Sequence, residues 1–235
     1  MRVAVVTVGD EILAGDTINT NAAWLCEQLT DHGVTVERIT TVPDTVSDIA
    51  RVVNEYHAEC DAVIVTGGLG PTHDDVTMEG IAAAVGRSVE PHDAAKEWLS
   101  AEKGYASDDL ADGTTALPAR ARMLPNEVGV APGAVVESIY AFPGVPAEMQ
   151  AMFESVAAEF SGEQTVTEIV AIDEYESELI DRIADLREQF AVTVGSYPGD
   201  CVRVKLTSTD PEAVAAARRW LTARVSLADT DDETA

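Results

Sequence analysis

Lysine is the scarcest charged residue in this chain of 235 residues, which contains only Lys96, Lys103 and Lys205. Lysine and arginine together number 15 against 42 aspartates and glutamates, which gives a formal net charge of −27. Such a field repels polyanions, so we expect neither nucleic acid nor an anionic membrane as a partner. We interpret the carboxylate coat as an adaptation to high salt, where screening removes the self-repulsion.

Cysteine and long apolar runs are also scarce. The three cysteines, Cys26, Cys60 and Cys201, are far apart and show no metal-binding or redox spacing, which fits a reducing compartment. No apolar run approaches the roughly 20 residues of a membrane span, and the first carboxylates come too early for a signal sequence. We therefore expect a cytoplasmic protein. A content of 46% hydrophobic residues argues against an acidic disordered chain.

Short apolar runs alternate with amphipathic helical patterns along most of the chain, which is typical of an α/β fold with a mostly parallel sheet. Val3 to Val8 is nearly all β-branched, as expected for a strand buried on both faces. The polar stretch Ser161 to Gln164 interrupts the pattern. The sequence therefore predicts an α/β domain over residues 1–162, a small α+β domain over 163–227, and a disordered acidic tail over 228–235.

A glycine-rich loop follows one of the buried strands, at Thr66-Gly67-Gly68-Leu69-Gly70. Glycine lets the chain turn sharply and lets a ligand approach the backbone. Exposed N–H groups in such a loop, close to the start of the next helix, bind phosphate or another anion. We therefore predict a phosphate-binding loop formed by Gly67, Gly68 and Gly70, with Thr72 as a further ligand-binding residue.

Two carboxylates, Asp74 and Asp75, come soon after this loop. They would repel a bare phosphate unless a cation stood between, which suggests a divalent metal bridging the protein and a phosphorylated ligand. The alternative role is to cap the helix that follows, and we expect one aspartate to cap it and the other to bind metal or ligand. His73 could bind metal or act as an acid or base, although a loop histidine more often does neither.

Other carboxylates follow the ends of two further predicted strands, where ligands bind in open α/β sheets. Asp10 and Glu11 come directly after the first strand, and Asp44 comes after the second. We favour a functional role for Asp10 and leave Glu11 undecided. For Asp44, capping of the next helix and a place in the same crevice as Asp10 and Asp75 weigh equally.

Three amide side chains are candidate ligand contacts. Asn19, Thr20 or Asn21 caps the helix that starts nearby, and Asn19 or Asn21 could equally reach a ligand. Asn126 lies in a loop dense in glycine and proline and is its best polar candidate for a ligand contact.

The segment TGGLGPTHDDVT, from Thr66 to Thr77, resembles the signature of the molybdopterin-binding superfamily. In this form it is most similar to the competence/damage-inducible protein A family. Four further segments fit that family in the same order: GDEILAGDTINTNAAWL from Gly9, Val42-Pro43-Asp44, LPNEVGVAPGA from Leu124 and FPGVPAEMQAM from Phe142. The resemblance covers roughly the first two-thirds of the chain. It implies a three-layer α/β/α domain, favours Asn21 as the ligand-binding asparagine, and makes Gly144 a backbone contact.

The resemblance also implies an activity, because the family's corresponding domain is associated with hydrolysis of nucleotide diphosphates such as ADP-ribose. It therefore implies a metal-dependent pyrophosphatase in which Asp75 and Asp10 are catalytic and Asp75, Asp10 and Asp44 hold a divalent ion, with Mg²⁺, Mn²⁺, Co²⁺ and Ni²⁺ not distinguished. One alternative is a molybdopterin-binding protein of molybdenum cofactor biosynthesis, although Leu69 and Asp74 replace the small hydroxyl and basic residues more usual there. Another is a non-catalytic nucleotide-binding subunit. Members are commonly oligomeric, so we expect a homo-oligomer.

Overall fold

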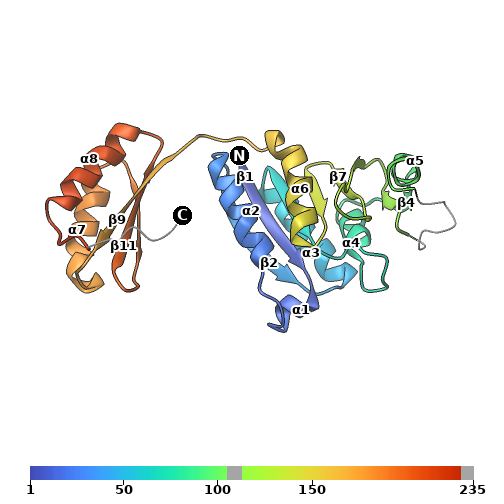
Figure 1. The fold of residues 1–235 in the computed structure, drawn as a ribbon, viewed down its shortest axis with the longest axis horizontal. Coiled ribbons are helices and arrows are strands. Elements are labelled where there is room, and N and C mark those ends of the chain that lie inside the picture. The colour runs from blue at the N-terminus through green and yellow to red at the C-terminus, as the bar shows by residue number, and fades with distance from the viewer. Residues whose placement is uncertain (105–112, 229–235) are drawn as a thin grey trace. The chain divides into compact units, whose positions relative to one another are not determined.

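The computed structural model describes residues 1–104 and 113–228, and the chain divides into two compact units, Met1–Gly162 and Glu163–Ala235. The N-terminal unit contains a sheet of six strands: β1 (Arg2–Val8), β2 (Thr35–Val42), β3 (Ala62–Thr66), β6 (Arg122–Leu124), β7 (Gly133–Val136) and β8 (Ile139–Phe142). Their order is β2-β1-β3-β8-β7-β6 (Figure 1). The first four run parallel, and β7 is antiparallel to both of its neighbours. The predicted, mostly parallel sheet is confirmed.

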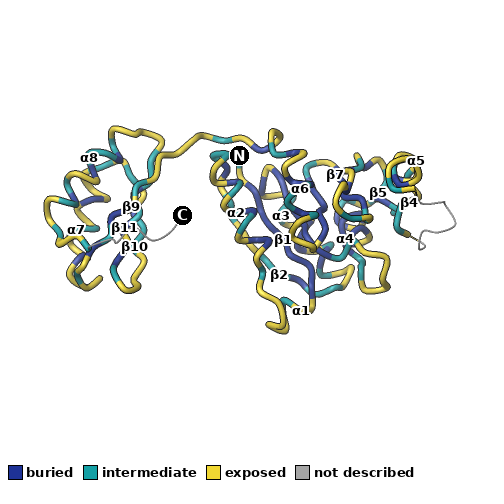
Figure 2. The backbone as a smooth tube through the Cα atoms, viewed as in Figure 1, coloured by how far each residue is buried: buried dark blue, intermediate teal, exposed yellow. Residues whose placement is uncertain are grey.

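The centre of this sheet is buried on both faces, as the β-branched composition of β1 and β3 predicts. Val3 and Val5 of β1 pack into one core, and Val6 and Val8 pack into the other, because successive side chains of a strand point to opposite faces. All residues of β3 are buried. Figure 2 shows this buried centre in dark blue.

Helices cover both faces of the sheet and complete three layers. On one face, α2 (Thr20–Asp31) and α6 (Pro146–Val156) bury side chains such as Leu25 and Phe153. On the other face, α3 (Val46–Glu59) and α4 (Thr77–Ala84) bury Ile49 and Ile81. The remaining elements among the described residues of the unit are α1 (Asp10–Leu13), α5 (Asp93–Glu102), η2 (Ala157–Glu159) and the strand pair β4 (Val89–Pro91) with β5 (Ala116–Pro118).

The C-terminal unit is a small α+β module, as predicted. Its elements are β9 (Val166–Ile172), α7 (Glu176–Gln189), β10 (Thr193–Tyr197), β11 (Val202–Ser208) and α8 (Pro211–Thr222). The strands form an antiparallel sheet in the order β10-β11-β9. Its core joins Leu179 and Leu186 of α7 with Leu221 of α8 and with alternate strand residues. The predicted disordered tail, apart from Ala228, lies outside the described residues.

Several short elements are absent from the sequence interpretation. Asp10 and Glu11, which look like a turn, begin the single helical turn α1. β7, β4 and β5 have four residues or fewer, and segments this short carry too little alternation to be recognised. Across the described parts of the chain, no helix combines the length and the apolar character that crossing a membrane requires.

Candidate functional site

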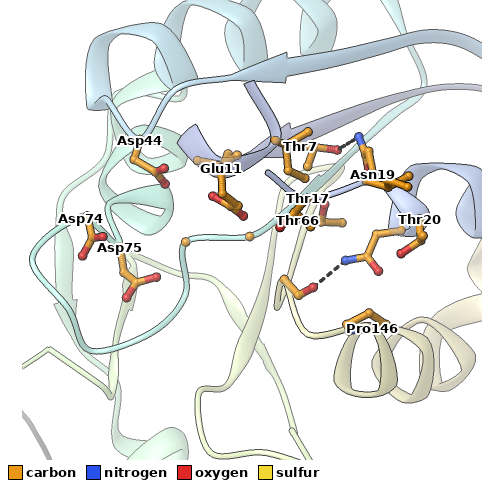
Figure 3. Close-up of a pocket in the computed structure, with 18 residues that line it drawn as sticks. Thr7, Glu11, Thr17, Asn19, Thr20, Asp44, Thr66, Asp74, Asp75 and Pro146 are labelled. Carbon is orange, nitrogen blue, oxygen red and sulfur yellow. Dashed lines mark hydrogen bonds between the residues drawn. The ribbon is translucent and has the colours of Figure 1, made fainter. Parts of the chain in front are cut away.

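The carboxyl ends of β1, β2, β3 and β8 meet at one edge of the sheet, and a pocket of about 240 Å³ opens there (Figure 3). Residues after each of these four strand ends contribute to its lining, together with the segment that leads into α2. This is the edge at which parallel α/β sheets bind ligands. The pocket therefore lies where strand order alone would place a site.

One end of the pocket is acidic. Figure 3 shows Asp44, Asp74 and Asp75 gathered there, with Glu11 between them and the rest of the lining. Within the described residues, no lysine, arginine or histidine lines this pocket. Burial raises the pKa of Asp44, and the charges of Asp10, Glu11 and Asp74 raise it further, against the opposing effect of a hydrogen bond from the Asp10 N–H. The acidic end thus carries uncompensated negative charge.

The other end is neutral, and hydroxyl and amide groups line it (Figure 3). Asn19 Oδ1 accepts a hydrogen bond from Ala22 N at 3.1 Å and caps α2, while Asn19 Nδ2 donates to Thr7 Oγ1 at 3.0 Å. Asn21 Nδ2 donates to Gly144 O at 2.7 Å, but Asn21 Oδ1 is buried without a partner in the described structure. The capping prediction is thus confirmed for Asn19, and Asn21 keeps an acceptor for a ligand.

The glycine loop combines close packing with free donors. Gly67 has φ 99° and lies so near the Val8 carbonyl oxygen that a Cβ there would collide with it. Its N–H donates to Phe142 O at 3.1 Å, so Gly67 shapes the pocket without offering that donor to a phosphate. The N–H groups of Gly68, Leu69 and Gly70 have no partner within the described chain. Gly68 lines the main pocket, and all three residues line a neighbouring pocket of about 180 Å³.

Asp75 is tied to the same loop. Its Oδ2 accepts a hydrogen bond from Thr72 N at 3.0 Å, and the Thr72 hydroxyl lies within hydrogen-bonding distance of both Asp74 and Asp75. Neither aspartate caps α4, whose N-cap is Val76 without a side-chain bond, so that prediction is wrong. The physical reason is that the loop folds back on itself and the carboxylates bond its own threonine, as short acidic side chains commonly do in turns.

Asp44 also differs from a helix cap. The N-cap of α3 is Thr45, which makes no side-chain bond, and Asp44 Oδ2 instead accepts a hydrogen bond from Asp10 N at 2.8 Å. The side chain of Asp44 lines the pocket, whereas Asp10 is absent from the lining and contributes this backbone link. Glu11, left undecided from the sequence, does line the pocket.

The predicted metal ligands do not form a cage by themselves. Considering only the residues that the structure describes, no three His, Cys, Asp or Glu side chains are arranged to hold a metal ion together. Mg²⁺, however, keeps several waters and binds proteins through one or two carboxylates plus the phosphates of its ligand. Asp44 and Asp75 both line the pocket, and the metal stays a prediction.

Two further candidates lie away from the pocket lining. Asn126 is buried, and its amide donates to Ala131 O and Glu148 Oε2 while accepting from Gly129 N, so it organises its own loop. The side chain of His73 is 99% exposed, and its Nδ1 lies 3.8 Å from Asp74 Oδ1.

Sequence reasoning missed the hydroxyl groups of the pocket. Thr66 is the last residue of β3, is fully buried and lines the pocket, but its hydroxyl has no partner in the described structure. Thr7, near the end of β1, holds Asn19. Both threonines lie within the last two residues of an apolar strand, and a glycine follows each strand. Because ligands bind at the carboxyl ends of such strands, this pattern could have identified them from the sequence.

The N-terminal unit is an α/β domain with a pocket at the carboxyl edge of its sheet, and comparison with known proteins gives its family. The family model described as "Probable molybdopterin binding domain" matches residues 4–161. A relative from Archaeoglobus fulgidus is 39% identical over 216 residues, which cover 91% of this chain and 93% of the relative. A CinA-like protein from Frankia casuarinae is 43% identical over 167 residues, which cover 65% of this chain and 38% of that protein.

A solved structure agrees with these sequence relatives. The protein CinA from Thermoplasma acidophilum is 36% identical and superposes with a TM-score of 0.63 over 68% of this chain and 97% of that one. The chain belongs to the molybdopterin-binding domain family, among its CinA-like members. The family predicted from the glycine-loop segment is therefore confirmed.

Proposed function

We propose that the N-terminal unit binds a phosphorylated pterin of the molybdopterin type in this pocket. Membership of the family supports a pterin-type ligand. The observation that carries the proposal is the run of unpartnered N–H groups at Gly68, Leu69 and Gly70 beside a pocket with a neutral opposite end. Consecutive free backbone donors attract a phosphate, and the neutral end suits an uncharged ring.

A divalent cation belongs to this proposal because of charge. A phosphate on the glycine loop would face Glu11, Asp44, Asp74 and Asp75 with no basic side chain in the described lining to offset them. Opposite charges must then come from a bound ion, and the carboxylates of Asp44 and Asp75 are the groups that would hold it. Asp10 positions Asp44 through its N–H, and Thr72 positions Asp75 through its N–H and hydroxyl.

The same acidic end favours a second candidate, metal-dependent hydrolysis of a nucleotide diphosphate such as ADP-ribose. A divalent ion supplies charge neutralisation of the pyrophosphate and lowers the pKa of an attacking water. The loop N–H groups would orient one phosphate, and Asp75 and Asp44 would fix the position of the reacting end. A monophosphate ligand uses the same groups but has no pyrophosphate bond to cleave, so turnover of a nucleotide diphosphate separates the two candidates.

Turnover is tested with purified protein in high potassium chloride, with ADP-ribose or FAD and with Mg²⁺, Mn²⁺, Co²⁺ or Ni²⁺ against a chelator control. Hydrolysis that needs metal and falls by at least about a hundredfold in Asp75→Ala supports the hydrolase. Asp75→Asn keeps an acceptor for Thr72 and separates loss of charge from loss of loop structure. Asp31→Ala removes an exposed carboxylate at the far end of α2 from the pocket and should keep full activity.

Binding decides between the remaining outcomes. Binding of a pterin monophosphate is measured by calorimetric titration. Tight binding that depends on Asp75, in a protein that hydrolyses no nucleotide diphosphate, supports the leading proposal. Full hydrolysis by Asp75→Ala would sink the pyrophosphatase candidate. A folded protein that binds neither a pterin monophosphate nor a nucleotide with any of the metals would sink both.

A further inference from the structure

Two polar atoms at the neutral end of the pocket are buried and lack a protein partner: Asn21 Oδ1 and Thr66 Oγ1. Asn21 is 8% exposed and Thr66 is fully buried. A buried polar atom without a hydrogen bond destabilises the fold, and such atoms are rare in native proteins. Their position in the lining of one pocket indicates that their partner is a molecule bound there.

The orientation of Asn21 is fixed by its surroundings. Its Nδ2 donates to Gly144 O at 2.7 Å, and a backbone carbonyl can only accept. Turning the amide over would place two acceptors against each other, so Oδ1 must face away from Gly144. The pocket therefore presents an acceptor whose direction is set jointly by the first turn of α2 and the loop after β8.

We infer that Asn21 and Thr66 recognise the edge of a nitrogen heterocycle with an N–H donor, so the pocket selects a pterin or purine ring over a ringless sugar phosphate. Asn21 Oδ1 accepts from an N–H on the edge of the ring system, either the exocyclic amine of a purine such as adenine or a ring N–H or amine of a pterin. The Thr66 hydroxyl donates to or accepts from the neighbouring ring atom. This specificity rests on the proposed function and adds the class of ring and its direction in the pocket.

Two features agree with that direction. Ile18 and Pro146 line the same pocket, and Ile18 is 83% exposed, so an apolar surface is available for a ring face to cover. The carboxylates and the glycine loop lie toward the other end (Figure 3). A ligand with a ring at one end and phosphate at the other therefore fits in one direction only.

Thr66→Val removes the hydroxyl while keeping the branched shape of the side chain. Without ligand, we expect the unfolding midpoint to rise by about 2 °C or more, because an unpaired buried hydroxyl is removed. In calorimetric titrations with Mg²⁺ in high salt, AMP and a pterin monophosphate should bind about tenfold more weakly to this variant. Ribose 5-phosphate, which is AMP without its ring, should bind the variant and the wild type equally.

Matched variants separate ring recognition from general packing. Thr77 carries the third unpartnered buried polar atom of the described structure, a hydroxyl, and does not line the pocket, but it adjoins Gly68 of the phosphate loop. Thr77→Val should therefore raise the midpoint and change the affinities for AMP and ribose 5-phosphate to the same extent. Thr66→Ser retains the hydroxyl and should keep ring binding. Asn21→Ala should weaken AMP binding without weakening ribose 5-phosphate binding to the same extent.

The results that would overturn the ring-edge assignment can be told apart from those that would overturn the proposed function. Equal losses for AMP and ribose 5-phosphate, unchanged AMP affinity in Thr66→Val, or a lowered midpoint in that variant would each overturn the ring-edge assignment. If no probe binds the wild type, the phosphate-ligand proposal itself fails and the ring specificity fails with it.

Discussion

At the amino ends of the parallel strands, polar side chains are paired with one another, whereas at the carboxyl ends several are left without partners. Before β8, Glu137 bonds His57 Nε2 and Arg87 Nη2 at 2.8 Å each, and Ser138 Oγ lies 3.2 Å from His57 Nδ1. At the opposite edge, Asn21 Oδ1 and Thr66 Oγ1 have no partner in the described structure.

One carboxylate from each edge, Glu137 and Asp44, has a shifted pKa, and the two shifts are in opposite directions. Hydrogen bonds from His57 and Arg87 lower the pKa of Glu137, so its charged form is favoured in the fold. Burial and neighbouring carboxylates raise the pKa of Asp44, so its charged form is disfavoured. The paired edge therefore stabilises the folded chain, while the pocket edge keeps interactions unsatisfied that a ligand and a cation can complete.

The paired edge also holds a strained residue. Glu137 has φ 55° in the two-residue connection between β7 and β8, a conformation that favours glycine or asparagine. A non-glycine residue there costs on the order of 1–3 kcal/mol. Its bonds to His57 and Arg87 offset that cost, so strain at this edge is supported by pairing.

The largest expected effect is at the pocket edge. Gly67→Ala places a Cβ against the Val8 carbonyl oxygen at a residue with φ 99°, so we expect a loss of about 3 kcal/mol or more in the free energy of unfolding. Gly15 also has a positive φ, 80°, but no atom lies near its missing Cβ, and Gly15→Ala should cost about 1 kcal/mol. Urea denaturation of both variants measures the difference.

A Gly67→Ala variant as stable as Gly15→Ala would contradict the comparison. It would mean that the backbone at the pocket edge can shift to accommodate a Cβ at residue 67. Close packing would then not be what holds the unpartnered polar groups of the pocket in place.

An intermediate effect is expected when charge is removed from each edge in turn. Arg87→Ala loses the bonds to Glu137 and to Ala119 O, and should lower the free energy of unfolding by about 1–2 kcal/mol without changing ligand affinity. Asp44→Asn keeps an acceptor for Asp10 N and removes a disfavoured charge, so its free energy of unfolding should stay within about 0.5 kcal/mol of wild type while metal-dependent ligand binding falls. Equal stability losses in the two variants would remove the distinction between the edges.

The pocket's location could be predicted from sequence, because it follows from strand order. Buried β-branched runs mark the central strands, and residues directly after them reach the same edge. That rule identified Asp44, Asp75 and the glycine loop. It also identified Asp10, whose backbone rather than side chain serves the site.

The roles of individual polar groups could not be predicted, because they depend on partners far along the chain. The amide of Asn19 is occupied by Thr7 and Ala22, whereas the amide of Asn21 bonds Gly144 O, 123 positions away, and leaves its Oδ1 without a partner in the described structure. The N–H of Gly67 is taken by Phe142 O from another strand. Local patterns favoured capping by Asp74 or Asp75, and the fold of the loop around Thr72 prevented it.

The smallest expected effect is the pH dependence of the paired edge. The pKa of Glu137 in the fold lies below its ordinary value of 4.5, so its charged form contributes stability above pH 4.5, and that contribution is lost as the pH falls through the lowered pKa. The carboxylate is 41% exposed, so screening keeps the contribution below about 1 kcal/mol.

Urea denaturation should therefore show wild type slightly more stable than Glu137→Gln at neutral pH, with the two converging in acid. Glu55→Gln, on the exposed side of α3 and without such partners in the described structure, controls for loss of one negative charge. If the Glu137→Gln difference were the same at pH 7 and in acid, the bonds to His57 and Arg87 would not favour the charged form, and pairing at this edge would not be what offsets its strain.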